Sequence, residues 1–186
     1  MKLYRVFWSF ESVTADLPGG ALYIPPQGTS RFDNPSHYRL LYASKQPQCA
    51  IAEAYGGLPR WFHAMLEPPR WLPSGAAAAL ASYELDDAQV GNVCDLDDPM
   101  RLMDLNLRPS HVITRNRVQT QRRGLAVFGR GAWIGLQWWS YYDAEWTNVA
   151  LWDHSSLRVV ETRKLTMSDP AVRAAARAIG RPVRSR

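Results

Sequence analysis

An arginine, a glutamate and a serine are the residues of this chain best placed to do chemistry. Arg31 follows a glycine-bearing loop in "GTSRFD", where a guanidinium can offer paired donors to a phosphate. Glu53 is the one acid in the apolar run "CAIAEAY", where alanine or leucine would pack at less cost. Ser140 ends "GLQWWS" without a GxSxG pattern or an adjacent histidine. It therefore suits the orientation of a hydroxyl better than nucleophilic attack.

Two further polar side chains stand in strand-like segments. Arg5 has apolar neighbours, so its charge should be paired or should line a polar cleft. Tyr42 comes just before a turn, where its ring could stack on a planar ligand or belong to the core. From spacing alone, ordinary structural roles stay open for all of these residues: a surface glutamate, a solvated loop arginine, a strand-end serine.

The composition is that of an ordinary globular protein. The 186 residues suffice for one domain, and 22 Lys and Arg against 17 Asp and Glu give a net charge of +5, which permits anionic partners but identifies none. No apolar run approaches the length of a membrane span, and the N-terminus has no signal-peptide pattern, so we expect a cytoplasmic protein that does not enter membranes. Cys49, Cys94 and four scattered histidines lack zinc-site spacing, and we expect no metal site.

The expected elements favour an α+β fold in a single domain over residues 1–180, followed by a basic tail at 181–186. Strands are expected at 2–8, 38–43, near the end of 76–85, and at 132–140, 147–153 and 157–165. Helices are expected within 44–57, 114–131 and 168–180. The proline-rich segment 58–75 should be an ordered excursion whose tryptophans are buried. The arginines from Arg173 onward are expected on the solvated face of the last helix and in the tail.

Helical periodicity predicts which faces are buried. In the first helix the expected buried stripe is Ala50, Ile51, Ala54 and Leu58, with Glu53 at its edge along the wall of a cleft. In the second helix the expected stripe is Val118, Gln121, Leu125 and Phe128.

Five blocks in this order resemble the RES-domain family, which is named for an Arg, a Glu and a Ser. They are "LYR", "RFDNP", "LLYASKQPQCAIAE", "TQRRGLAVF" and "GLQWWSYYDAEWTNVALW", and the likeness runs from Leu3 to about Asp153. The resemblance implies an antiparallel-rich fold with flanking helices, like that of ADP-ribosyltransferases. It also implies NAD+ degradation with no further cofactor, commonly by the toxin of a toxin–antitoxin pair, with a cognate antitoxin as partner.

By position, the resemblance makes Arg31, Glu53 and Ser140 the catalytic residues, although in some members the serine falls near the "TQ" helix, where this chain has Thr120. It further implies an NAD+-binding set, namely Arg5, Tyr42, Thr120 and Asn148. Cleavage of the nicotinamide–ribose bond builds positive charge on the ribose, which a fixed carboxylate would stabilise. On this interpretation Arg31 and Arg5 hold the pyrophosphate, Tyr42 stacks near nicotinamide and Ser140 bonds the ribose.

Three functions stay open from the sequence. The first is hydrolysis or phosphorolysis of NAD+, and the second is transfer of ADP-ribose to a protein. The third is a non-enzymatic module whose basic tail binds a partner or nucleic acid, although we do not expect nucleic acid as a partner.

Overall fold

A seven-stranded mixed sheet forms the centre of the computed structural model, which describes residues 1–183. In spatial order its strands are β4 (Val93–Asp95), β5 (Gly135–Trp139), β6 (Thr147–Leu151), β2 (Leu41–Ser44), β1 (Lys2–Ser9), β3 (Ala77–Leu85) and β7 (Leu157–Lys164). Only β4 and β5 are parallel neighbours, and all other neighbouring strands are antiparallel. This single, mostly antiparallel sheet with flanking helices confirms the α+β class.

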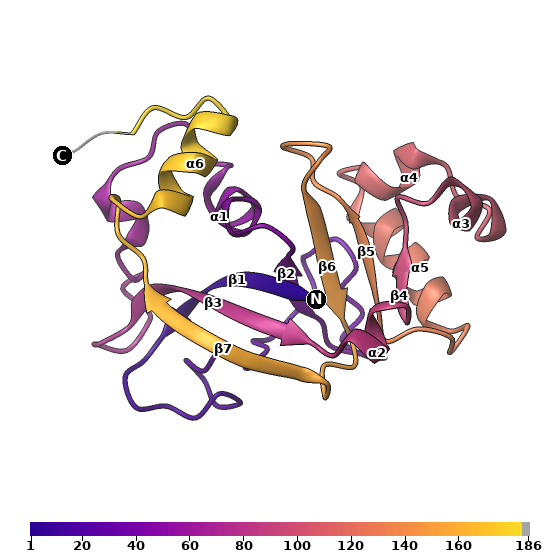
Figure 1. Cartoon of the computed structure of the whole chain (residues 1–186), viewed down its shortest axis with the longest axis horizontal. Coiled ribbons are helices and arrows are strands. Elements are labelled where there is room, and N and C mark those ends of the chain that lie inside the picture. The colour runs from indigo at the N-terminus through magenta and orange to yellow at the C-terminus, as the bar shows by residue number, and fades with distance from the viewer. Residues whose placement is uncertain (184–186) are drawn as a thin grey trace.

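The sheet is weakly joined at its centre. Whereas β1 pairs with β3 from Lys2 to Ser9, β1 and β2 are joined through one residue pair, Tyr4 opposite Ser44. In Figure 1 the strands β1, β3 and β7 lie across the view, while β5 and β6 stand nearly upright. The chain therefore forms two half-sheets that diverge on either side of this pair.

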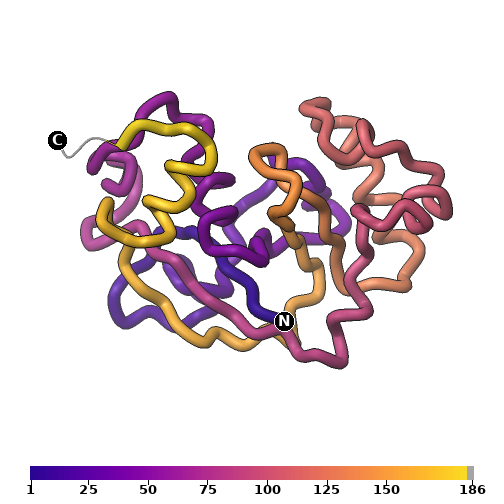
Figure 2. Tube along the Cα trace, turned by 45° about the horizontal axis from the view of Figure 1, so that its top comes forward, coloured from indigo at the N-terminus to yellow at the C-terminus, as the bar shows by residue number. Residues whose placement is uncertain are grey.

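Helices cover each half-sheet separately. The helices α1 (Pro47–Tyr55) and α6 (Pro170–Ala178) share an apolar cluster with β1 and β3. The helices α3 (Pro99–Asp104), α4 (Pro109–Ile113) and α5 (Arg117–Phe128) lie beside β4, β5 and β6, where Leu102, Val112 and Val127 pack with Leu136 and Trp138. Figures 1 and 2 both place α1 and α6 side by side at one end and these three helices at the other. The short helix α2 (Asp87–Val90) and the 3₁₀ turn η1 (His63–Leu66) complete the elements.

The long connection from β1 to β2 covers the opposite face of the first half-sheet. Its Ala21 and Ile24 are buried in a cluster with Leu3, Leu41 and Tyr83. Because side chains alternate along a strand, Leu3, Arg5 and Phe7 of β1 face this connection while Tyr4, Val6 and Trp8 face the helices. This alternation places the Arg5 side chain beneath the loop that precedes Arg31.

The structure confirms most expected elements and corrects several details. Strand β2 begins at Leu41 and β5 at Gly135, each three residues later than expected, while β4, α2, α3 and α4 had no counterpart in the sequence interpretation. Ala54 of α1 is exposed, and Leu58 lies beyond the end of the helix and is exposed as well, so the expected stripe is wrong at these two positions. Cys49, Ala52 and Tyr55 are buried instead, because α1 packs between the sheet and α6.

Helix α5 follows the predicted stripe only in part: Leu125 and Phe128 pack against the core, but the other buried positions differ from the prediction. Val118 is 60% exposed, whereas Thr120, Gly124 and Val127 are buried. Gly124 lies so close to Phe32 and Tyr38 that an added Cβ would come within 2.8 Å of the Tyr38 hydroxyl. The helix therefore approaches the segment after Arg31 through its small residues.

The segments around the C-terminus are partly as expected. In 58–75 Trp61 is fully buried, but Trp71 is 78% exposed, so the expected burial of both tryptophans is wrong. Arg173 and Arg177 lie on the exposed face of α6, as predicted. The expected tail begins packed against the domain, since the Arg181 guanidinium donates to the Gly56 carbonyl at 2.9 Å. Its last residues, 184–186, lie outside the described residues.

No helix within residues 1–183 combines the length and the apolar character that crossing a lipid bilayer requires.

Candidate active site

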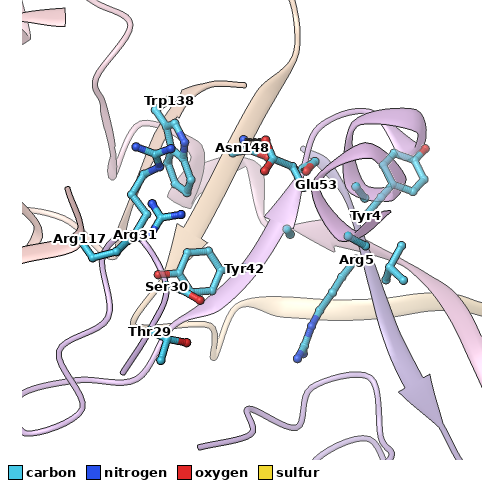
Figure 3. Close-up of a pocket in the computed structure, with 15 residues that line it drawn as sticks. Tyr4, Arg5, Thr29, Ser30, Arg31, Tyr42, Glu53, Arg117, Trp138 and Asn148 are labelled. Carbon is cyan, nitrogen blue, oxygen red and sulfur yellow. Dashed lines mark hydrogen bonds between the residues drawn. The ribbon is translucent and has the colours of Figure 1, made fainter. Parts of the chain in front are cut away.

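A cleft of about 440 Å³ opens where the two half-sheets diverge. Its floor comes from both sides of the Tyr4–Ser44 pair, and its walls come from the loop before β2, from α1 and from the start of α5. The lining residues are Tyr4, Arg5, Val6, Thr29, Ser30, Arg31, Tyr42, Ala43, Ser44, Ala50, Glu53, Ala54, Arg117, Trp138 and Asn148. Figure 3 shows Arg31, Arg117 and Trp138 on one side of this cleft and Glu53 with Asn148 facing them. The junction between β1 and β2, where only Tyr4 and Ser44 pair, is the seam of the sheet. The divergence of the two half-sheets at this seam therefore creates the site.

The Glu53 carboxylate is held by two donors on one of its oxygens. The Ser140 hydroxyl donates to Oε1 at 2.7 Å, and the Asn148 amide donates to the same atom at 2.6 Å. Within residues 1–183, Oε2 has no hydrogen-bond partner and Glu53 makes no ion pair. One oxygen thus fixes the side chain and the other remains available to a ligand.

A buried polar network behind Glu53 fixes its two donors. The Ser44 hydroxyl donates to Asn148 Oδ1 at 2.9 Å, so the Asn148 amide nitrogen must face Glu53. The Cys49 thiol also lies 3.4 Å from Oδ1, and burial raises the pKa of this thiol to about 12. The Ser140 hydroxyl accepts the Tyr142 backbone N–H at 3.1 Å. Ser140 is 2% exposed and Asn148 is 5% exposed, so little water can compete for these bonds.

Local structure explains how residues distant in the chain meet here. Pro47 occupies the first turn of α1, where it fixes φ for the helix, and the buried Cys49, Ala50 and Ala52 turn Glu53 toward the cleft. Asn148 is the direct β6 partner of Ser44 on β2. Ser140 lies just after β5, where its N–H donates to the Trp146 carbonyl at 2.7 Å and closes the β5–β6 connection.

Arg31 faces the cleft but is also tied to the segment that leads into α5. Its Nη1 donates to the carbonyls of Val112 and Thr114 at 2.6 and 2.8 Å. Burial, and then the nearby Arg117, lower the pKa of the Arg31 guanidinium from its usual value. The backbone carbonyl of Arg31 accepts the Thr120 hydroxyl. Arg31 thus connects the loop before β2 to the segment that leads into α5.

Arg5 and Tyr42 also use their polar atoms within the protein. Arg5 Nη1 donates to the carbonyls of Tyr23 and Ala21 at 2.9 and 3.2 Å. The Tyr42 hydroxyl donates to Asp33 Oδ1 at 2.8 Å, and burial followed by the Asp33 charge raises the pKa of this phenol. Tyr42 therefore offers the cleft its ring rather than its hydroxyl.

The structure gathers most of the residues singled out in the sequence. Arg5, Arg31, Tyr42, Glu53 and Asn148 line the cleft. Two others lie behind the lining, and each supports a residue that does line it. Ser140 contacts Glu53, and Thr120, which is fully buried, contacts the backbone of Arg31.

The other lining residues were not predicted as part of a site, and the polar or aromatic ones among them include Thr29, Ser30, Ser44, Arg117 and Trp138. Ser44 stands at the expected start of the first helix, and Arg117 stands in a run of arginines that resembles a solvated helix face. Nothing in the local sequence distinguishes them. In residues 1–183, no three His, Cys, Asp or Glu side chains are close enough to form a metal-binding cluster.

Comparisons with known proteins identify the family and the fold. The model of the RES domain matches residues 2–174, nearly the whole chain. In fold, the chain is similar to the toxin in the crystal structure of the M. tuberculosis MbcT–MbcA toxin–antitoxin complex. The TM-score is 0.59, with 16% sequence identity over 96% of this chain and 88% of that chain. No curated protein sequence matches significantly. The resemblance noted in the sequence is confirmed, and the chain belongs to the RES domain family.

Proposed function

We propose that this protein cleaves the nicotinamide–ribose bond of NAD+. The observation that carries the proposal is the Glu53 carboxylate, with Oε1 held by Ser140 and Asn148 and Oε2 without a partner inside an arginine-lined cleft. A carboxylate oriented in advance stabilises a developing cation without reorganisation during the reaction.

The reaction needs little more than such a carboxylate. When the bond between ribose C1′ and the nicotinamide nitrogen breaks, its electron pair neutralises the pyridinium and leaves a cationic ribose, as in glycoside cleavage. Glu53 Oε2 would stabilise that cation and accept hydrogen bonds from the ribose hydroxyls. An acceptor then adds to C1′ and releases its proton. Water, phosphate or a protein side chain can fill that role, so ADP-ribose transfer to a protein would use the same first step.

The remaining cleft residues have roles that suit a dinucleotide. The Tyr42 ring gives a flat surface for nicotinamide, because its hydroxyl is already engaged by Asp33. Arg31 and Arg5 supply positive potential for the pyrophosphate. Ser140 would act through Glu53, which it orients, rather than through the substrate.

We also propose that the protein is the toxin of a toxin–antitoxin pair and has an antitoxin partner. Membership of the RES domain family supports this proposal, as does a similar structure that was crystallised as a toxin–antitoxin complex. Coexpression of genes adjacent to this one should identify the partner by relief of growth inhibition. Growth unaffected by expression of the active protein would contradict the toxin role.

Incubation of the purified protein with NAD+ tests the proposed activity. Nicotinamide should be released by the wild-type protein, and far more slowly by Glu53→Gln, with or without a chelator. Chromatography of the second product identifies the acceptor: free ADP-ribose indicates water, its 1″-phosphate indicates phosphate, and labelled protein indicates transfer. The absence of nicotinamide release with every acceptor would refute the proposal.

The non-enzymatic alternative can be tested by truncation. Removal of residues 181–186 would also remove the Arg181 contact with Gly56, so the sharper variant ends at Val183. Nicotinamide release should survive this truncation. The binding module would be favoured if the truncated protein no longer bound nucleic acid or a partner and if neither it nor the wild-type protein consumed NAD+.

A further inference from the structure

The three arginines that line the cleft differ in how many of their guanidinium N–H groups are hydrogen-bonded within the protein. In both Arg5 and Arg31, Nη1 donates hydrogen bonds to two backbone carbonyls. The Arg117 guanidinium, by contrast, makes no hydrogen bond or ion pair with any residue of 1–183, although it lines the cleft. All five of its N–H donors are therefore available to a ligand.

The backbone of Arg117 is nevertheless held firmly. Asn116 caps α5 by accepting the Gln119 N–H, so Arg117 is the first residue of that helix. The buried Thr120 hydroxyl contacts the carbonyls of both Arg31 and Arg117. The Nη1 bonds of Arg31 to Val112 and Thr114 hold the segment just before this cap. Arg31 and Thr120 thus position Arg117, whose own side chain remains free.

Two free hydroxyls lie on the same cleft. Thr29 and Ser30 line it from the loop before Arg31, and neither side chain has a hydrogen-bond partner in residues 1–183. The loop itself is fixed, because Asp33 Oδ2 accepts the Gly28 and Ser30 N–H groups at 2.8 and 2.7 Å. A free guanidinium fork and two hydroxyl donors on fixed backbone suit the oxygens of a phosphate group.

We propose that Arg117, with the Thr29 and Ser30 hydroxyls, forms the subsite that binds the pyrophosphate of the dinucleotide directly. This inference rests on the proposed function for the identity of the ligand. It assigns the direct contact to a residue outside the Arg, Glu and Ser of the family name, and it makes Arg31 chiefly a positioning residue for Arg117. Substitution of Arg117 should therefore weaken substrate binding without weakening the fold, because its exposed side chain supports nothing else.

The test is a set of dissociation constants measured by calorimetry with ADP-ribose as the probe, which requires no turnover. Arg117→Met should raise the ADP-ribose Kd about tenfold to hundredfold, the range expected when hydrogen bonds to a charged group are lost. Arg117→Lys should lie between this variant and wild type, because the charge remains but the paired geometry is lost. The Kd for nicotinamide riboside, which has no phosphate, should change less than about twofold.

The matched control is Arg122→Met, which removes the same charge from an exposed position of α5 outside the cleft lining. It should leave the ADP-ribose Kd at the wild-type value. Equal weakening by both variants, equal weakening for nicotinamide riboside, or an unchanged Kd in Arg117→Met would each overturn the subsite. Absence of ADP-ribose binding to the wild-type protein would overturn it as well. If wild type binds ADP-ribose through Arg117 but releases no nicotinamide from NAD+, the subsite stands and the proposed activity fails.

Discussion

Ser140 and Glu53 lie 87 residues apart in the chain, yet the hydroxyl of one donates to the carboxylate of the other at 2.7 Å. The bond joins the end of β5 to α1 across the seam of the sheet, and it fixes the orientation of the one acid that lines the cleft within residues 1–183.

Replacement of Ser140 by alanine should lower turnover more than binding. Among residues 1–183, the substitution leaves Asn148 as the only donor to Oε1. Loss of one hydrogen bond to a charged group costs about 1.5–3 kcal/mol. If that cost appears mainly in the transition state, kcat should fall roughly ten- to hundredfold while the Kd for NAD+ stays nearly constant. Ser36→Ala, at an exposed position, is the control. Wild-type kcat in a folded Ser140→Ala protein would show that this bond has no part in catalysis.

Substitution of Arg31 should lower both stability and ADP-ribose affinity, whereas substitution of Arg117 should lower affinity alone. The reason is that the Arg31 side chain also supports the fold. Arg31→Met leaves the carbonyls of Val112 and Thr114 without their donor, which should cost about 1–3 kcal/mol of stability. Thermal unfolding should therefore occur at a lower temperature, and ADP-ribose affinity should fall with it. Unchanged thermal stability in Arg31→Met would contradict the positioning role.

Gly124 should not tolerate even a methyl group. An alanine Cβ would lie 2.8 Å from the Tyr38 hydroxyl and 3.2 Å from Phe32 side-chain carbons. The Tyr38 hydroxyl cannot retreat freely, because it donates to the Phe32 carbonyl at 2.8 Å. Gly124→Ala should thus destabilise the protein by about 1–3 kcal/mol, although alanine favours helix by about 1 kcal/mol.

Gly91→Ala gives the matched control, since apart from the adjoining backbone no heavy atom lies within 4 Å of the added Cβ. Chemical denaturation should show a lower free energy of unfolding for Gly124→Ala than for Gly91→Ala. Equal stability would mean that α5 can move away from the segment after Arg31.

The two buried thiols should make stability fall at alkaline pH. Burial raises the pKa of Cys49 and of Cys94 from 9.0 to about 12, so the native state holds thiol protons that the unfolded chain releases. This contribution is fully present below pH 9 and is lost as the pH rises toward 12. Denaturant unfolding at a series of pH values should show the decline, and the Cys49→Ala/Cys94→Ala variant should show less of it.

Thiol labelling gives an independent reading of the same burial. At pH 8 both cysteines should resist a chromogenic disulfide reagent until denaturant is added. Native thiols that react as fast as denatured ones would contradict their burial.

Much of the fold could be predicted because local signals agreed with it. Asp169 followed by Pro170 starts α6 as expected, and its alanine-rich face is buried while Arg173 and Arg177 are exposed. The aromatic and β-branched run from residue 2 to 8 forms β1. In these elements propensity, end signals and packing all favour the same structure.

The failures have a common physical cause, which is contact between segments distant in sequence. The close approach of Gly124 to Phe32 and Tyr38 sets the buried face of α5, so the predicted stripe wrongly included Val118 although it placed Leu125 and Phe128 correctly. The three-residue strand β4 is too short to have a periodicity and exists through its parallel pairing with β5.

In the candidate site, too, residues with a local sequence signal could be predicted, whereas residues whose roles depend on distant contacts could not. Glu53 could be singled out because an acid among small apolar residues is costly to pack. Arg117 could not be, because no sequence signal separates it from Arg122, and only the structure shows that Arg117 lines the cleft while Arg122 does not. The roles of Ser140 and Thr120 also depend on contacts with Glu53 and Arg31, which no local pattern shows.

The most direct test of the account is the turnover of NAD+ by Glu53→Gln, measured beside its NAD+ affinity and thermal stability. The substitution keeps the size of the side chain and removes the charge that should stabilise the cationic ribose. The account predicts that kcat falls by about 100-fold or more, as when a preorganised electrostatic group is lost. The NAD+ Kd should change little, and the unfolding temperature should stay the same or rise. Wild-type kcat in a folded Glu53→Gln protein would contradict the proposal that this carboxylate drives cleavage of the nicotinamide–ribose bond.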